Sequence, residues 1–234
     1  MSADDERYPP VNPGRFMRTV AVFRFLSNLW VKDIIIEGQE YIPMEGGAIY
    51  CVNHLSRLDS PLQTLSLPRH AHALAGEKYK RTLFRPILAV AGAIYINRGE
   101  VDRRALQQAI HVLEDGNLLA VAIEGTRSKS GELADGKAGV AYLATRANVP
   151  VIPGVCWGTE RMMDDLKHLR RTPSIHIRVG PPIRFPKGRA RGTQLEAYTE
   201  EIMVTLAAML PERYRGRYAD HPRLLEKLAV YGGK

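Results

Sequence analysis

Short apolar runs alternate with amphipathic stretches along most of the chain. The runs are rich in Val, Ile and Ala, which is typical of buried strands. They predict strands over Ile34–Glu37, Ala48–Val52, Ala71–Ala75, Ala93–Ile96, Leu118–Ile123, Val151–Trp157 and Ser174–Val179. The stretches between and after them predict helices over Pro61–Leu67, Leu83–Ala91, Val101–Glu114, Gly139–Ala147 and Thr193–Leu210. Strands that alternate with helices indicate an α/β fold with a mostly parallel sheet flanked by helices.

The most apolar N-terminal segment is Phe16–Val31, with the sequence FMRTVAVFRFLSNLWV. As a helix it would be about 24 Å long, which is shorter than the ~30 Å hydrocarbon core of a bilayer. Apolar side chains cover most of its circumference, so it needs burial on nearly all sides. Either the protein core or the interface of a bilayer would supply that burial.

No internal repeat, low-complexity tract or linker divides the 234 residues. We therefore predict a helical, membrane-associating segment over residues 1–32, one α/β domain over residues 33–212 and a basic C-terminal extension over residues 213–234. The first fifteen residues are polar and rich in proline, so no signal peptide is expected.

Composition and charge narrow the class of partner. The chain is 45% hydrophobic and 25% charged, as folded proteins are, and its formal net charge is +8. A basic surface fits nucleic acid, an anionic membrane surface or phosphorylated small molecules, or has no particular partner. No aromatic-interleaved nucleic-acid motif occurs, so we expect no nucleic acid. Cys51 and Cys156 lie in apolar runs without metal-binding spacing, which predicts buried, reduced thiols and no metal.

The stretch VNHLSRLDSP places His54 directly after a predicted strand and Asp59 at the start of a predicted helix. In open α/β sheets, sites form beyond the carboxyl ends of the strands. Two interpretations fit Asp59. It is either a helix N-cap followed by Pro61, or the carboxylate that orients a general-base histidine. Asn53 also has a purely structural interpretation, that of a turn residue.

A histidine–aspartate pair needs a hydroxyl to activate. The chain has no Gly-x-Ser-x-Gly elbow, and Ser56 and Ser60 are typical of turn and cap residues. A hydroxyl of the substrate is therefore the better candidate.

A second polar stretch, AIEGTRSKSGEL, follows the predicted strand Leu118–Ile123. A glycine beside a hydroxyl and a guanidinium is a sensible phosphate cradle, although a solvated polar loop has the same composition. Arg98 likewise follows a predicted strand. The Gly131–Ala138 stretch has the spacing of a nucleotide-binding P-loop, but Ala138 replaces the required Ser or Thr.

Four blocks in register resemble the glycerolipid acyltransferases, specifically the 1-acyl-glycerol-3-phosphate acyltransferases of phospholipid synthesis. The blocks are Asn53-His54-x4-Asp59, Gly92–Arg98, Glu124–Ser128 and Val149–Pro153. The resemblance covers residues 35 to 185 approximately. One departure is Ala122-Ile123, where the family commonly has Phe-Pro, and this leaves the identity of the acceptor open.

The resemblance implies a fold like that of glycerol-3-phosphate acyltransferases, an acyltransferase domain over residues 33–212 and a mechanism. His54 would deprotonate the free hydroxyl of lysophosphatidic acid, and Asp59 would orient it. The alkoxide would attack an acyl-CoA or acyl-carrier-protein thioester directly, giving phosphatidic acid without an acyl-enzyme or a cofactor. The implied substrate-binding residues are Asn53, Arg98, Glu124, Gly125, Thr126, Arg127 and Ser128. The transition state also needs an oxyanion donor, for which Lys78 is the candidate.

The stretch Lys78–Val90, KYKRTLFRPILAV, interleaves cations with apolar residues, which suits an anionic membrane surface. An ordinary helix with a basic exposed face has the same pattern. With Phe16–Val31, it favours a peripheral, monotopic protein on the cytoplasmic face of a membrane. Alternatives are another lysolipid acceptor, a thioesterase or lipid esterase that uses the same dyad, and a noncatalytic basic binding module.

Overall fold

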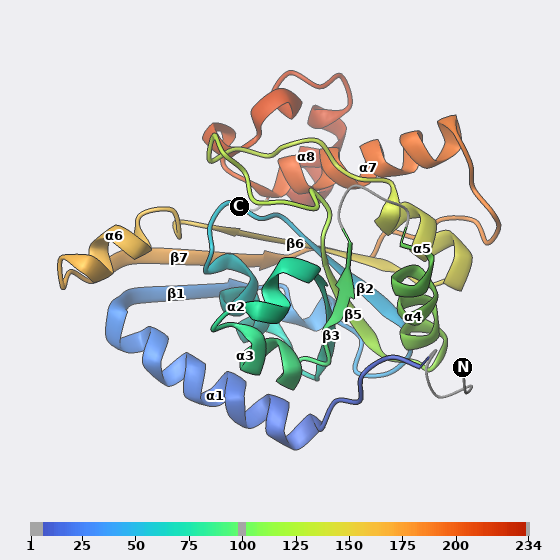
Figure 1. The fold of residues 1–234 in the computed structure, drawn as a ribbon. Helices are drawn as coiled ribbons and strands as arrows, with labels where there is room; N and C mark the ends of the chain where they lie inside the picture. Colours follow the sequence, from blue (N-terminus) through green and yellow to red (C-terminus); the bar gives the residue numbers. More distant parts are fainter. Residues whose placement is uncertain (1–6, 98–101, 233–234) are drawn as a thin grey trace.

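The predicted strand Ala48–Val52 is β2, the middle strand of a seven-stranded sheet, and all its residues are buried. The structure, a computed structural model, describes residues 7–97 and 102–232 (Figure 1). The strand order is β1-β7-β6-β2-β5-β3-β4. The other strands are β1 (Val31–Glu37), β3 (Ala71–Gly76), β4 (Ile94–Ile96), β5 (Leu118–Ala122), β6 (Val151–Trp157) and β7 (Thr172–Val179). All seven predicted strands are confirmed, with ends shifted by up to three residues.

The sheet is mostly parallel, as predicted. β2 pairs in parallel with β5 on one side and with β6 on the other. The exception is β7, which pairs antiparallel with β6 and parallel with β1. The carboxyl ends of β2, β5 and β6 therefore lie at one edge of the sheet, and the ends of β7 and β1 lie at the other.

Two layers of helices cover the sheet (Figure 1). The helices are α1 (Pro13–Trp30), α2 (Asp59–Gln63), α3 (Arg85–Val90), α4 (Arg103–Glu114), α5 (Gly139–Ala147), α6 (Met162–Lys167), α7 (Thr193–Met209) and α8 (Leu224–Tyr231). Side chains from α4, α5, α7 and α8 share one hydrophobic cluster with Ile49 and Cys51 of β2. Side chains from α1 and α2 share the other with Tyr50 and Val52. Successive side chains of β2 point to opposite faces of the sheet, so this strand contributes to the hydrophobic clusters on both faces.

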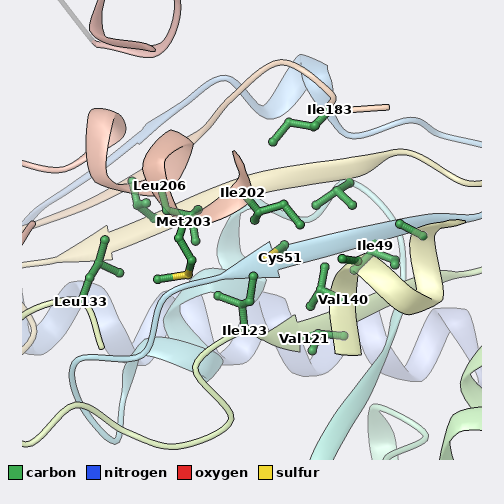
Figure 2. Packing of buried hydrophobic residues seen from close by; sticks show 14 of the residues in the cluster. Ile49, Cys51, Val121, Ile123, Leu133, Val140, Ile183, Ile202, Met203 and Leu206 are labelled. Atoms are coloured by element: carbon green, nitrogen blue, oxygen red, sulfur yellow. The ribbon is translucent and has the colours of Figure 1, made fainter. Parts of the chain in front are cut away.

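The core on the α7 side is built from aliphatic side chains that converge on β2 and β5. Figure 2 shows Ile202 and Met203 of α7 facing Cys51 and Ile123. Both cysteines are buried and free, as predicted, and burial raises the pKa of the Cys51 and Cys156 thiols. The thiols are therefore protonated core groups rather than nucleophiles.

The five helices predicted after the first strand are present, but two others were not predicted. α6 has only six residues, too few for apolar periodicity to mark it. α8 lies within the predicted C-terminal extension, yet its Leu224 belongs to the core. The predicted helix Pro61–Leu67 is divided into α2 and a 3-10 turn over Thr64–Ser66.

The predicted N-terminal helix is α1, which begins after Asn12, whose side chain accepts a bond from the Arg15 amide at 2.9 Å. Its inner face is buried through Phe16 and Val20. Its outer face carries an apolar stripe, which we define as Val22, Phe25, Leu26 and Leu29, each between 47% and 65% exposed. Packing within the chain therefore covers only half of the helix. Among residues 7–97 and 102–232, no helix combines the length and apolar character needed to cross a membrane.

Candidate active site

The end of β2 is fixed to its neighbour β6 by Asn53. The buried Asn53 side chain donates from Nδ2 to the Cys156 carbonyl at 3.0 Å and accepts from the Cys156 amide at 2.8 Å. Gln63 of α2 donates to the Asn53 carbonyl at 3.1 Å. Both ends of the Asn53 amide are thus bonded within the protein, and the next residue, His54, leaves the sheet in a fixed direction.

His54 and Asp59 face one another at the carboxyl end of β2. Nδ1 of His54 lies 3.7 Å from Oδ2 of Asp59, which is beyond hydrogen-bond distance. Nδ1 is buried and has no hydrogen-bond partner in the described part of the chain. The imidazole as a whole is 12% exposed. A small movement of either side chain would complete the bond, as happens when catalytic hydrogen bonds shorten on substrate binding.

Asp59 is fully buried and is held by three donors. Oδ2 accepts from the Ser56 amide at 2.6 Å, and Oδ1 accepts from the Ser56 hydroxyl at 2.8 Å and from the Thr159 hydroxyl. The N-cap of α2 is Leu58, and no side chain caps that helix. The interpretation of Asp59 as an N-cap is therefore wrong, because its carboxylate bonds back to the loop that carries His54.

Glu124 fixes the backbone of His54 from the next strand. Its Oε1 accepts from the His54 amide and its Oε2 from the Ala134 amide, both at 2.8 Å. Four residues further on, the Ser128 amide donates to the His54 carbonyl at 2.8 Å. Burial raises the pKa of Glu124, while the amides of Ala134 and His54 act in the opposite direction. The loop 124–128 therefore lies beside His54 and bonds to both sides of its backbone.

The rest of this loop is more accessible. Gly125 turns the chain at φ +67°, and its amide donates to the Ala122 carbonyl at 3.0 Å. Thr126 is exposed, and Arg127 is half-buried. Arg98 lies outside the described residues. Lys78 is exposed on a 3-10 turn after β3, with its ammonium 5.4 Å from the centre of the Tyr79 ring.

Ser56 and Thr159 contact Asp59, but the sequence did not single them out as site residues. Thr159 lies 100 residues from Asp59 along the chain. The signal that could have found it is its position just beyond β6, where the rule that marked His54 applies equally. Within the described ranges, no three His, Cys, Asp or Glu side chains gather as a metal ion would require.

Comparisons with known proteins point to one family. A sequence model described as Acyltransferase matches residues 33–157. The 1-acyl-sn-glycerol-3-phosphate acyltransferase of Borreliella burgdorferi is 26% identical over 161 residues, 67% of this chain and 64% of that protein. The enzyme of the same name from Cocos nucifera is 28% identical over 196 residues, 79% of this chain and 60% of that protein. This chain thus spans between 60% and 64% of the length of these two relatives.

A solved structure is similar as well. The crystal structure of the 1-acyl-sn-glycerophosphate acyltransferase from Thermotoga maritima has a TM-score of 0.63 and 26% sequence identity. The match covers 80% of this chain and 76% of that chain. The likeness therefore extends over most of the chain.

Proposed function

Because this chain belongs to the acyltransferase family, we propose that it transfers a fatty acyl group from a thioester to the free hydroxyl of lysophosphatidic acid, giving phosphatidic acid. One observation carries the proposal: the His54 imidazole faces the buried Asp59 carboxylate at the edge of the sheet, beside the 124–128 loop. The names of the similar proteins support this acceptor. The thioester carrier is coenzyme A or an acyl-carrier protein.

In the proposed reaction, Nε2 of His54 takes the proton of the acceptor hydroxyl as its oxygen attacks the thioester carbonyl carbon. Asp59 stabilises the imidazolium through Nδ1. The tetrahedral intermediate then expels the thiolate of the carrier, and the imidazolium gives its proton to this leaving group. A serine nucleophile is not needed, and the Ser56 hydroxyl beside the dyad already donates to Asp59.

The residues around the dyad divide into two groups. We assign Asn53 and Glu124 to positioning His54, in place of the substrate-binding role that the resemblance implied. Their side chains are buried and bonded to the backbones of Cys156, His54 and Ala134. The second group would bind the acceptor phosphate and consists of Gly125, Thr126, Arg127 and Ser128. We add Arg98 on the sequence alone, because it lies outside the described residues. Cationic and hydroxyl donors beside a tight glycine turn suit a phosphate. Lys78 stays the candidate oxyanion donor.

The proposed enzyme lies on a membrane surface through α1 and the segment before α3. The exposed apolar stripe of α1 has the spacing i, i+3, i+4, i+7, so its members lie on one helical face. Leu83, 96% exposed, follows a cationic turn that contains Lys78 and Arg81. Apolar side chains beside cations favour the interface of an anionic bilayer, where the lysolipid acceptor is found.

The test is acyl transfer by the purified protein. Long-chain acyl-CoA and lysophosphatidic acid are supplied together, and both thiol release and phosphatidic acid are measured. His54→Ala should lower kcat by at least about 10²-fold, while His168→Ala, at an exposed position on the far end of α6, should not. A His54→Ala variant as active as the wild type would refute the dyad.

Three other outcomes identify the alternatives. Equal thiol release without any acceptor indicates a thioesterase or esterase. Transfer to a different lysolipid in an acceptor panel corrects the acceptor but leaves the reaction class in place. Anion binding without turnover, unchanged in His54 variants, indicates a noncatalytic basic module.

A further inference from the structure

We propose that Thr159 is a positioning residue for the acyl transfer, because its hydroxyl fixes the rotation of the Asp59 carboxylate and so presents one oxygen to His54. This inference rests on the proposed function. Thr159 lies just outside residues 33–157, the part of the chain that the family's sequence model matches.

The two oxygens of Asp59 are used differently. Oδ1 accepts two hydroxyl donors, from Ser56 and Thr159, and a carboxylate oxygen has two lone pairs to offer. Among the described residues, Oδ2 accepts only from the Ser56 amide, which leaves one lone pair, and it is the oxygen that lies 3.7 Å from Nδ1 of His54. Nδ1 in turn has no other partner in the described structure. Nδ1 of His54, which has no acceptor within the described ranges, therefore lies beside Oδ2 of Asp59, which has a lone pair free.

Thr159 is held in place independently of Asp59. Gly158 turns the chain at φ +87°, and a Cβ there would lie 2.5 Å from the Ser174 carbonyl oxygen, so only glycine fits. The Thr159 carbonyl accepts from the Met162 amide at 3.1 Å, which closes the turn into α6. The hydroxyl is fully buried with the rest of the side chain. The turn thus fixes the backbone position from which the hydroxyl reaches Asp59.

The C-terminal part of the chain supports the same turn. The Tyr214 hydroxyl donates to the carboxylate of Glu160, the residue after Thr159, and accepts from Arg213. The Tyr214 carbonyl accepts from the Leu133 amide at 2.9 Å, in the segment that follows the 124–128 loop. Tyr214 therefore joins two segments of the site. One is the turn that carries Thr159, and the other is the segment after the 124–128 loop.

Loss of the Thr159 hydroxyl should act on the dyad rather than on the fold. The carboxylate would keep only the two Ser56 donors, both from one residue, and could rotate about its Cβ–Cγ bond. Oδ2 would then face Nδ1 in fewer molecules, so the carboxylate would favour the Nδ1–H tautomer of the imidazole less strongly. We expect kcat to fall by roughly 10- to 100-fold in Thr159→Val, the effect of losing one hydrogen bond to a charged group. KM should stay within about twofold because Thr159 does not face the substrate.

The experiment compares four proteins in the acyl-transfer assay: Thr159→Val, Thr159→Ser, Asp59→Asn and the double variant Thr159→Val/Asp59→Asn. Thr159→Ser keeps the hydroxyl and should retain most of the wild-type kcat. The double variant should be no slower than Asp59→Asn alone, because both changes act through one carboxylate. Thr205→Val is the matched control, since Thr205 is equally buried but its hydroxyl donates to the Glu201 carbonyl within α7.

A second readout does not depend on turnover. The ¹⁵N shifts of the His54 ring, assigned with a His54→Gln variant, should show the Nδ1–H tautomer in the wild type and a mixture in Thr159→Val. An unchanged tautomer, a kcat within twofold of the wild type, or an additive loss in the double variant would overturn the proposal. If the wild type transfers no acyl group to any lysolipid, the proposed function fails, and the tautomer measurement alone decides the role of Thr159.

Discussion

The backbone amide of His54 donates to Oε1 of Glu124 at 2.8 Å, although the two residues are 70 positions apart in the chain. Since Oε2 of the same carboxylate accepts from Ala134, one buried side chain joins the end of β2 to the loop that follows β5. The position of the proposed base therefore depends on an acidic residue that bonds to its backbone.

Replacing Glu124 tests this dependence. Glu124→Gln keeps one acceptor oxygen but turns an NH2 group toward the other amide donor. We expect a loss of about 1–3 kcal/mol in the free energy of unfolding, the cost of a buried unsatisfied donor, together with a lower kcat. Urea unfolding and the transfer assay measure the two effects. Glu132→Gln, at an exposed position in the following loop, should change the unfolding free energy by less than about 0.5 kcal/mol.

Arg127 tests the proposed phosphate site. Arg127→Ala should raise KM for lysophosphatidic acid by roughly 10- to 100-fold, because a charge-assisted bond to the phosphate is lost. An uncharged monoacylglycerol, used as a poor acceptor, should show no such change. Lys129→Ala in the same loop is the control, since that residue is exposed. An equal loss with both acceptors would mean that Arg127 serves the loop and not the phosphate.

The apolar stripe of α1 tests membrane association. The triple change Phe25→Ser, Leu26→Ser and Leu29→Ser should weaken binding to vesicles that contain anionic lipid by more than about tenfold, because several large side chains no longer enter the bilayer interface. Co-sedimentation measures the bound fraction. Leu225→Ser, at an 80% exposed position on α8, should bind vesicles like the wild type. Unchanged binding by the triple variant would show that α1 is not the contact surface.

His72 makes stability depend on pH. It is buried beneath the N-terminal segment, edge-on to Tyr8, and burial lowers its pKa below 6.5. Between its folded pKa and 6.5, the unfolded chain binds more protons than the folded chain, so the free energy of unfolding rises with pH there. Acidification below pH 6.5 should therefore destabilise the protein.

Urea unfolding between pH 5 and pH 7.5, a range set by the ordinary histidine pKa of about 6.5, measures this slope. His72→Gln should reduce it, and the remainder is expected from His176, whose pKa burial also lowers. His168→Gln, at an exposed position, should leave the slope as it is in the wild type. A slope that His72→Gln does not change would assign the pH dependence to other groups.

The sequence predicted those features that depend on local pattern. Apolar runs such as Ala48–Val52 predicted every strand of the sheet. The rule that sites form beyond the carboxyl ends of strands indicated His54 and Glu124 as candidate site residues. The reversed direction of β7 was not predicted, because direction depends on how a strand is connected and not on its own residues. Thr159 was missed for a related reason: its partner Asp59 is distant in the chain, and a single Gly-Thr pair has no distinctive pattern.

The bonds that the 124–128 loop makes to His54 have a consequence for redesign. Glu124 and Ser128 hold the backbone of the base, and Gly125 needs its positive φ, so these three positions have little freedom to vary. Thr126 and Arg127, which lie between Gly125 and Ser128, form no hydrogen bond with His54 in the described structure and are at least partly accessible. We therefore expect that changes at Thr126 and Arg127 can alter the preference for the acceptor while the bonds that position His54 stay in place.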